Sequence, residues 1–262
     1  MKNKILQVIL LFTITFTGQI SGQIRINSMN NGDTRQMALF QTNDIKKLYF
    51  QEVSDPKEFI NGKEYLLYYY RSNTSPLLLL GKEFNAVLFM NDRKYKNIKL
   101  QYDTYLDEVI YTDTSIMINS QFPRIALNNF IVQGFSLFMD FDSLIFKYLR
   151  FPENRGKNIP EGFYELARDG RSSLIIKHMS KQYMKQGVYE YDYNPVMYVS
   201  LGDSYRKVKN KKEFLLMFGE YSLEIKKFIK ESNIRIKQAG KNDINRVLKH
   251  YESLLSSETG PR

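Results

Sequence analysis

The chain of 262 residues contains no cysteine, no tryptophan and only two histidines. Disulfide bonds and thiolate metal sites are therefore excluded, and the hydrophobic core has to supply the stability. The histidines, His178 and His250, lie far apart in the sequence, and no G-x-S-x-G nucleophile motif accompanies them. A Ser-His-Asp hydrolase site is thus disfavoured. We expect neither a metal ion nor a cofactor.

Long apolar runs are also lacking. The run at residues 5–16 is about 12 residues long, whereas roughly 20 are needed to cross a bilayer. It follows the basic segment MKNK and precedes the small, polar stretch TGQISGQ. This order is typical of a secretory signal peptide, here residues 1–22 with cleavage after Gly22. We therefore expect export to the periplasm or cell surface, with no transmembrane segment after cleavage.

The charge is unevenly distributed along the chain. Residues 23–146 carry 13 basic and 14 acidic side chains, whereas residues 147–262 carry 23 and 14. A basic half favours an acidic partner or surface, although a solvated surface without a dedicated partner has the same pattern. Because export argues against nucleic acid, the expected partners are another envelope protein or an anionic envelope polymer.

Residues 61–151 have the pattern of successive antiparallel strands. In YKNIKLQYD, for example, Ile98, Leu100 and Tyr102 fall on one face, as in a half-buried strand. Turn residues separate runs rich in aromatic and branched side chains. The predicted strands are residues 61–72, 75–81, 81–90, 95–103, 107–113, 115–120, 128–141 and 143–151.

The pattern changes towards the C-terminus. A polar linker is expected at residues 152–162, and Asp169-Gly170 and Gly202-Asp203 predict the turns of two hairpins. Asn210 then begins a capping box, and apolar residues recur at helical spacing in two segments.

The predicted fold is α+β and mainly antiparallel β. We expect a β-sandwich or open barrel of hairpins with a C-terminal helical pair. We expect a signal peptide at residues 1–22 and an antiparallel β region at residues 23–151. Hairpins at residues 152–209 continue the same domain. The helical pair follows at residues 210–257, and residues 258–262 form a frayed tail.

The stretch QYDTYLDE (residues 101–108) contains the catalytic candidates Asp103 and Asp107. Two carboxylates held about 5–10 Å apart would suit a glycosidase. The stretch lacks the glycine and the tight acid spacing of a calcium loop. We favour a different interpretation, in which these acids mark the end of one strand and the start of the next.

Three consecutive tyrosines, Tyr68, Tyr69 and Tyr70, form the candidate binding surface. A strand would place their rings on both of its faces, so that at least one ring faces solvent. Flat aromatic rings bind sugars and proteins, but tyrosine also fills half-buried sheet faces.

The C-terminal helices combine an apolar face that includes Phe214, Phe218 and Ile225 with many lysines. A basic amphipathic helix can lie on an anionic membrane. We favour docking of the apolar face on the protein's own sheet, with the lysines in water.

The run Tyr95-x-Asn97-x-x-Leu100-x-Tyr102-Asp103-x-Tyr105-x-Asp107 resembles a pattern in uncharacterised exported proteins of Bacteroidota. The preceding strand that starts at Gly62 and the terminal segment NKKEFLLMF…INRVLKHYESL are also similar to such proteins. The resemblance implies export and a shared fold. It carries no known activity and names no catalytic residue.

These observations favour an exported cell-envelope protein with a non-enzymatic binding or scaffolding role. The sequence does not decide whether any catalysis occurs. The alternatives are an exported hydrolase with a carboxylate pair and a peripheral membrane-surface protein that uses the basic C-terminal helices.

Overall fold

The computed structural model describes residues 62–69, 71–115, 117–118, 120–152, 159–202 and 204–258. The predicted signal peptide, Tyr70, most of the predicted linker and residues 259–262 of the predicted tail lie outside these ranges. Within them, no helix has the length and apolar character needed to cross a membrane.

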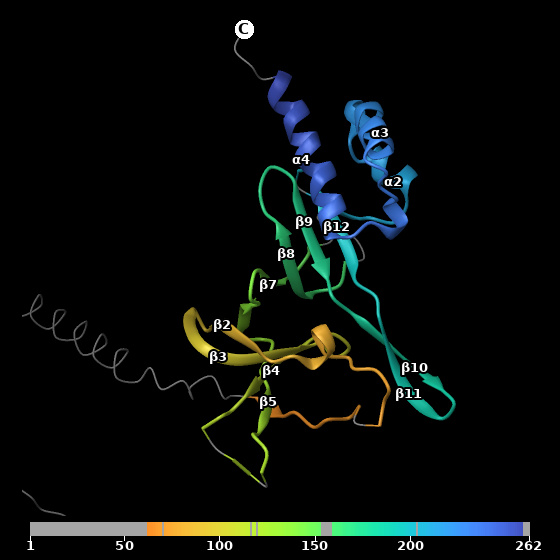
Figure 1. Ribbon diagram of the computed structural model, residues 1–262. Helices are drawn as coiled ribbons and strands as arrows, with labels where there is room; N and C mark the ends of the chain where they lie inside the picture. Colours follow the sequence, from red (N-terminus) through yellow and green to blue (C-terminus); the bar gives the residue numbers. More distant parts are fainter. Residues whose placement is uncertain are drawn as a thin grey trace, which may run out of the picture. The chain divides into compact units, whose positions relative to one another are not determined.

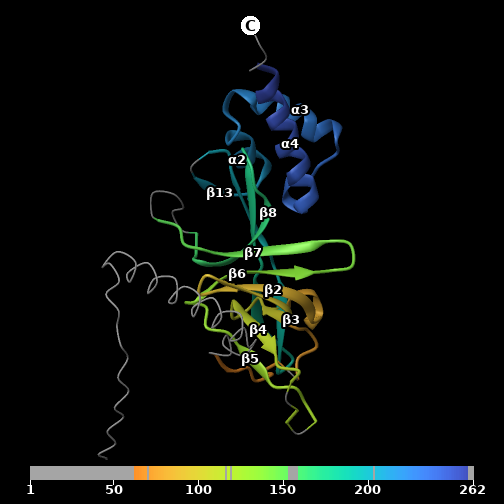
Figure 2. The same ribbon diagram turned by 90° about the vertical axis from the view of Figure 1, so that its left-hand side faces the viewer.

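Eleven strands pair in antiparallel fashion into one continuous sheet (Figure 1). Their order across the sheet is β1-β5-β4-β3-β2-β6-β7-β8-β9-β12-β13. Figure 2 shows β6 and β7 between β2 and β8. The strands are β1 (Lys63–Glu64), β2 (Phe84–Met90), β3 (Arg93–Asp103), β4 (Glu108–Thr112), β5 (Arg124–Ala126), β6 (Val132–Phe138), β7 (Ser143–Leu149), β8 (Gly162–Arg168), β9 (Ser173–Lys177), β12 (Val196–Ser200) and β13 (Tyr205–Lys207).

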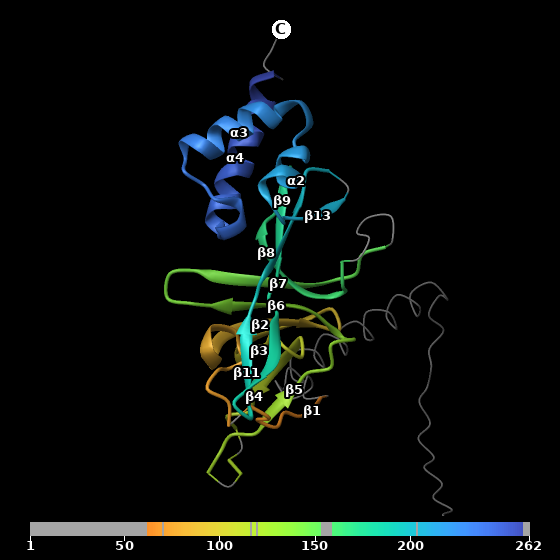
Figure 3. The same cartoon turned by 90° about the vertical axis from the view of Figure 1, so that its right-hand side faces the viewer.

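A separate hairpin and several helices complete the described chain. The hairpin consists of β10 (Ser180–Lys185) and β11 (Val188–Tyr193), which follow β9 and precede β12 in the chain. Figure 3 shows β11 extending away from the end of the sheet that carries β8 and β9. The helices are η2 (Leu78–Gly81), α2 (Lys211–Leu216), η3 (Gly219–Tyr221), α3 (Ser222–Glu231), η4 (Ile236–Gln238) and α4 (Lys241–Glu258).

The predicted fold class is confirmed: the protein is mainly antiparallel β with helices at its C-terminal end. The sequence left a β-sandwich and an open barrel as alternatives. In the structure the strands form one sheet, which is not closed into a barrel. The two predicted hairpins are the pairs β8–β9 and β12–β13.

Two predicted strands are wrong. The strand expected at residues 61–72 ends after Glu64, and Tyr68 and Tyr69 lie in a turn. The strand expected at residues 75–81 is instead the short helix η2, in which Leu79 and Leu80 have φ angles of 51° and 60°. Both side chains are exposed, at 52% and 88%. In the first segment, the hydrogen bonds of Tyr65 and Tyr68 to Asp103 override the strand propensity.

A third predicted strand, at residues 115–120, is also absent from the part of the chain that the structure describes. Ile118 forms an isolated bridge with Gln121 instead of joining a ladder. The two residues exchange both backbone hydrogen bonds, at 2.9 Å each. Because Ile118 and Gln121 are close in sequence, the segment turns back on itself before β5 begins.

The main core lies on one face of the central strands. As predicted, Ile98, Leu100 and Tyr102 point to the same side, and each is at most 5% exposed. Phe135 and Phe146 stack against one another there, with ring centroids 4.5 Å apart. This layer of aromatic side chains surrounds Tyr102 and fixes its position beneath the turn that joins β3 to β4.

The C-terminal helices pack on the other end of the sheet. The Asn210 side chain accepts a hydrogen bond from the Glu213 N–H at 3.0 Å, which confirms Asn210 as the predicted N-cap. The Glu213 carboxylate accepts the Asn210 side-chain amide at 2.8 Å rather than its backbone N–H, so the reciprocal bond of the predicted capping box takes a different form. Phe214, Phe218 and Ile225 are at most 2% exposed and share a cluster with residues of β9 and β12. The face that a membrane-binding mode requires is therefore buried.

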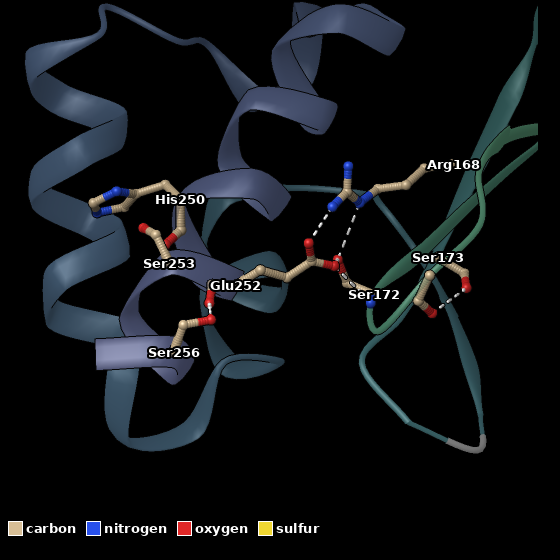
Figure 4. A network of polar contacts seen from close by, with 8 residues as sticks. Arg168, Ser172, Ser173, His250, Glu252, Ser253 and Ser256 are labelled. Carbon is tan, nitrogen blue, oxygen red and sulfur yellow. Dashed lines mark hydrogen bonds and ion pairs between the residues drawn. The ribbon is translucent and has the colours of Figure 1, made fainter. Parts of the chain in front are cut away.

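Polar contacts connect Glu252 of α4 to Arg168 and Ser172 of the β8–β9 hairpin (Figure 4). The Glu252 carboxylate accepts hydrogen bonds from the Ser172 N–H at 2.9 Å and from the Ser172 hydroxyl at 2.6 Å. It also forms an ion pair with Arg168. Since all three groups are partly shielded from water, this contact fixes the orientation of α4 on the sheet.

Replacing Phe214 by alanine should lower the free energy of unfolding by about 3–5 kcal/mol, because it opens a cavity between helix and sheet. Leu223→Ala is the matched control, since Leu223 is 73% exposed and its loss should cost less than about 0.5 kcal/mol. Chemical denaturation of both variants measures the difference. Equal stabilities would contradict the docking of the helices.

Candidate functional site

Asp103, the first catalytic candidate, organises the turn between β3 and β4. Its Oδ1 accepts hydrogen bonds from the backbone N–H groups of Tyr105 at 2.8 Å and Leu106 at 2.9 Å. A short polar side chain that bonds to the backbone two or three residues on is the usual way in which aspartate stabilises a turn. Asp103 therefore marks the end of β3 and stabilises the turn that follows it, as predicted.

The other oxygen of Asp103 binds two tyrosines from a distant segment. Oδ2 accepts the Tyr65 hydroxyl at 2.7 Å and the Tyr68 hydroxyl at 2.5 Å. The carboxylate is therefore satisfied by four donors, and Asp103 has no exposed surface. A side chain that is buried and saturated in this way has no free oxygen for a substrate.

Asp107, the second candidate, forms a separate network with two buried partners, while its own side chain stays 27% exposed. Its Oδ2 lies 2.6 Å from the Lys177 Nζ, and its Oδ1 accepts the Tyr102 hydroxyl. Lys177 also donates to the Phe163 carbonyl at 3.2 Å. Burial lowers the pKa of the Lys177 ammonium below its ordinary value, and the neighbouring Asp107 partly offsets that effect.

Gly162 makes room for this ion pair. Its φ angle of 138° lies in the region that disfavours side chains, and a Cβ atom there would overlap both the Asp107 carboxylate and the Lys177 ammonium. Asp103 and Asp107 thus belong to one turn but bind different partners. Asp103 joins the turn to the tyrosine segment, and Asp107 joins it to β9.

Five tyrosines gather above Asp103. Neighbouring rings lie with their centroids between 5.5 and 6.3 Å apart, mostly edge to face. The five are Tyr65, Tyr68, Tyr69, Tyr105 and Tyr191. Of the predicted binding residues, Tyr68 is 37% exposed, Tyr69 is half-buried, and Tyr70 lies outside the described residues.

The β10–β11 hairpin supplies one side of this cluster. Gln182 on β10 accepts the Tyr105 hydroxyl at 3.4 Å and donates to the Tyr191 hydroxyl at 2.7 Å. The Ser180 N–H donates to the Thr104 carbonyl at 3.0 Å. The hairpin is thereby attached to the turn that carries Asp103.

The exposed aromatic surface continues along the hairpin. Met184 pairs with Tyr189, and this pair lies on the same face as Gln182 and Tyr191 because residues two apart in a strand share a face. Met184 is 63% exposed and Tyr189 is 52% exposed. We define the tyrosine surface as Tyr68, Tyr105, Met184 and Tyr189, with Tyr191 beneath them.

Sequence reasoning missed most of this surface. It singled out residues 68–70 because they are consecutive, but Tyr105, Tyr189 and Tyr191 come from other segments. A signal for the hairpin part was present: tyrosines alternate in VYEYDY, which places Tyr189 and Tyr191 on one strand face. No local sequence pattern indicated that this strand face contacts the turn that carries Asp103.

The two histidines have separate surroundings. His178 is buried between Glu165, at 2.7 Å from its Nε2, and the Tyr193 hydroxyl, at 2.5 Å from its Nδ1. Burial, and to a lesser extent the charge of Glu165, raises the pKa of Tyr193 to about 12, so its hydroxyl stays protonated. His250 stacks on Phe228. No serine nucleophile contacts His178 among the described residues.

Within the described ranges, no group of three or more histidine, aspartate or glutamate side chains is placed to hold a metal ion.

Comparisons with protein-family models, curated proteins and solved structures gave no significant match for this chain. The resemblance to exported proteins of Bacteroidota therefore stays a prediction.

The tyrosine cluster predicts a loss of stability in alkali. Burial, reinforced by the Asp103 charge, raises the pKa of Tyr65 and Tyr68 well above the ordinary value. Their contribution is complete below about pH 10, the pKa of an unfolded tyrosine, and declines as the pH rises beyond it.

Tyrosinate absorbance and unfolding, both followed from pH 8 to 12, measure this effect. We expect Tyr65 and Tyr68 to ionise only as the protein unfolds. Ionisation of all the tyrosines near pH 10 in the folded protein would contradict the cluster.

Proposed function

We propose that this protein is an exported cell-envelope component with a non-enzymatic binding role, and that the tyrosine surface contacts its partner. The observation that carries the proposal is the way in which the rings are held. The hydroxyls of Tyr68 and Tyr105 are bound to Asp103 and Gln182, while parts of both rings remain exposed. Such rings lose little conformational freedom on binding, which lowers the cost of association.

Composition supports a binding surface as well. Tyrosine is enriched in protein interfaces, where a large ring combines apolar contact area with a polar end. The surface is assembled from the 65–69 segment, the β3–β4 turn and the β10–β11 hairpin, which Asp103, Thr104 and Gln182 hold together. A partner would therefore meet a prearranged surface.

The carboxylate chemistry favours binding over hydrolysis. A glycosidase needs two carboxyl groups that reach the substrate, one of them as acid and the other as base or nucleophile. Asp103 is buried with four donors, and Asp107 is paired with Lys177. Both side chains contribute to the structure of the turn that supports the tyrosine surface.

The double variant Tyr105→Ala/Tyr189→Ala tests this role, because neither residue contacts Asp103 directly through its side chain hydroxyl. Immobilised protein is exposed to detergent-solubilised envelopes, and retained components are compared between variants. We expect the double variant to lose at least about tenfold in affinity for a component that wild type retains, as removal of two interface aromatics does.

Phe141→Ala is the matched control, since Phe141 is an exposed aromatic residue on the β6–β7 turn, outside the tyrosine surface. It should retain the component as wild type does. Equal retention by wild type, control and double variant would refute the proposal.

A further inference from the structure

The outer edge of β10 carries backbone groups that no other described strand uses. Among the strands that the structure describes, β10 pairs only with β11. In an antiparallel pair, residues that bond to the neighbouring strand alternate with residues whose backbone N–H and C=O groups point away from it. The phase of this alternation therefore decides what the edge of β10 can bind.

Hydrogen bonds at the base of the hairpin fix the phase. The Asn194 N–H donates to the Met179 carbonyl at 2.8 Å, so these two residues form a bonded pair. The next pair in the register, Ser180 with Tyr193, is then a non-bonded pair. In agreement, the Ser180 N–H points away from β11 and donates to the Thr104 carbonyl at 3.0 Å. Every second residue of β10 from Ser180 onward therefore faces outward.

Gln182 and Met184 are the outward-facing residues beyond Ser180. Within the described ranges, no backbone hydrogen bond joins their outward N–H and C=O groups to another segment. The opposite edge of the hairpin differs, because the Tyr191 N–H on β11 donates to the Thr74 hydroxyl at 2.6 Å. An exposed strand edge with unpaired backbone groups is a template for a further strand.

The side chains of β10 divide between the two faces of the hairpin. Gln182 and Met184 lie on the face of the tyrosine surface, whereas Lys181 and Lys185 lie on the other face. Met184 and both lysines are exposed. A strand added to this edge would therefore meet an apolar side chain on one face and two ammonium groups on the other.

The acids near these lysines lie on β11, on the far side of β10 from an added strand. Asp192 stands opposite Lys181, and the Glu190 carboxylate is 3.8 Å from the Lys185 ammonium. The Glu190 carboxylate also accepts the Tyr183 hydroxyl at 2.8 Å, so it is shared between two partners. Opposite charges on neighbouring strands stabilise their pairing and like charges oppose it. The edge itself is positive and favours an acidic strand.

The same lysines disfavour a second copy of this chain as the added strand. An antiparallel register that bonds Gln182 to Met184 of the other copy sets Lys181 opposite Lys185. Two such like-charge contacts would arise in each symmetric pair, and lysines on exposed edges are a known means of preventing self-pairing. An acidic segment of another protein meets no such opposition.

We propose that the β10 edge binds an extended segment of a partner protein as an added strand, in which acidic side chains facing Lys181 and Lys185 alternate with apolar side chains facing Met184. Backbone hydrogen bonds to Gln182 and Met184 supply affinity, and the alternating side chains supply specificity. The inference rests on the proposed binding role and gives the chemical character of the partner.

The test uses the peptide acetyl-Glu-Val-Glu-Val-Glu-amide as the probe, and the same peptide with lysine in place of glutamate as its control. Binding is followed by the backbone amide signals of Gln182 and Met184 in NMR titrations. We expect saturable shifts with the glutamate peptide. It should bind at least about tenfold more tightly than the lysine peptide, because opposite-charge pairs become like-charge pairs in the control.

Met184→Pro removes one outward N–H and leaves the bonds between β10 and β11 in place, since proline is tolerated on an edge where the N–H faces solvent. Met184→Ala is the matched control, because it loses the same side chain and keeps the N–H. We expect Met184→Pro to bind the glutamate peptide at least about tenfold more weakly than Met184→Ala, because a peptide carbonyl loses its donor.

The double variant Lys181→Glu/Lys185→Glu should reverse the preference between the two peptides. Because both lysines are exposed, this variant should fold normally, and it keeps the test decisive if Met184→Pro is unstable.

Several results would overturn the proposal. They are an absence of saturable shifts in wild type, equal binding by Met184→Pro and Met184→Ala, and an unchanged peptide preference in the lysine variant. A concentration-dependent dimer in analytical ultracentrifugation that Met184→Pro abolishes would also overturn it, because a second copy would then occupy the edge.

The envelope experiment separates this inference from the tyrosine surface. Met184→Pro and Tyr105→Ala/Tyr189→Ala are both exposed to solubilised envelopes. Loss of the retained component in both variants supports the added strand. Retention by Met184→Pro alone would refute the added strand and leave the tyrosine surface in place, whereas retention by both would refute the proposed function as well.

Discussion

The structure depends on one buried carboxylate, that of Asp103. Its two oxygens accept four hydrogen bonds, two from the backbone of its own turn and two from tyrosines more than thirty residues earlier in the chain. Hydrogen bonds to an ionised group are stronger than those between neutral groups. A single side chain thereby shapes the β3–β4 turn and positions Tyr65 and Tyr68 on it.

Other features follow from this constraint. Because Asp103 shapes the turn, Thr104 meets Ser180 and Tyr105 meets Gln182, so the β10–β11 hairpin is attached at the same place. Asp107, at the far end of the turn, pairs with Lys177 on β9 and ties the first half of the sheet to the second. The acids that resemble a catalytic pair in the sequence thus join elements that are distant along the chain.

Local sequence patterns predicted the parts of the fold that depend on local forces. The alternation around Leu100, the hairpin at Asp169-Gly170 and the N-cap at Asn210 are all present, since each follows from backbone geometry within a few residues. The strand through Tyr68 was wrong because hydroxyl bonds to Asp103 outweigh strand propensity.

The central claim is that Asp103 holds the tyrosine cluster, and a double-mutant cycle with Asp103→Asn and Tyr65→Phe measures it directly. Free energies of unfolding are determined for wild type, both single variants and the double variant. The structure predicts a coupling of about 1–3 kcal/mol, because each single variant leaves a buried partner unsatisfied and the double variant does not add a second such cost. Additive effects within about 0.3 kcal/mol would show that the two groups act independently, and would contradict the account.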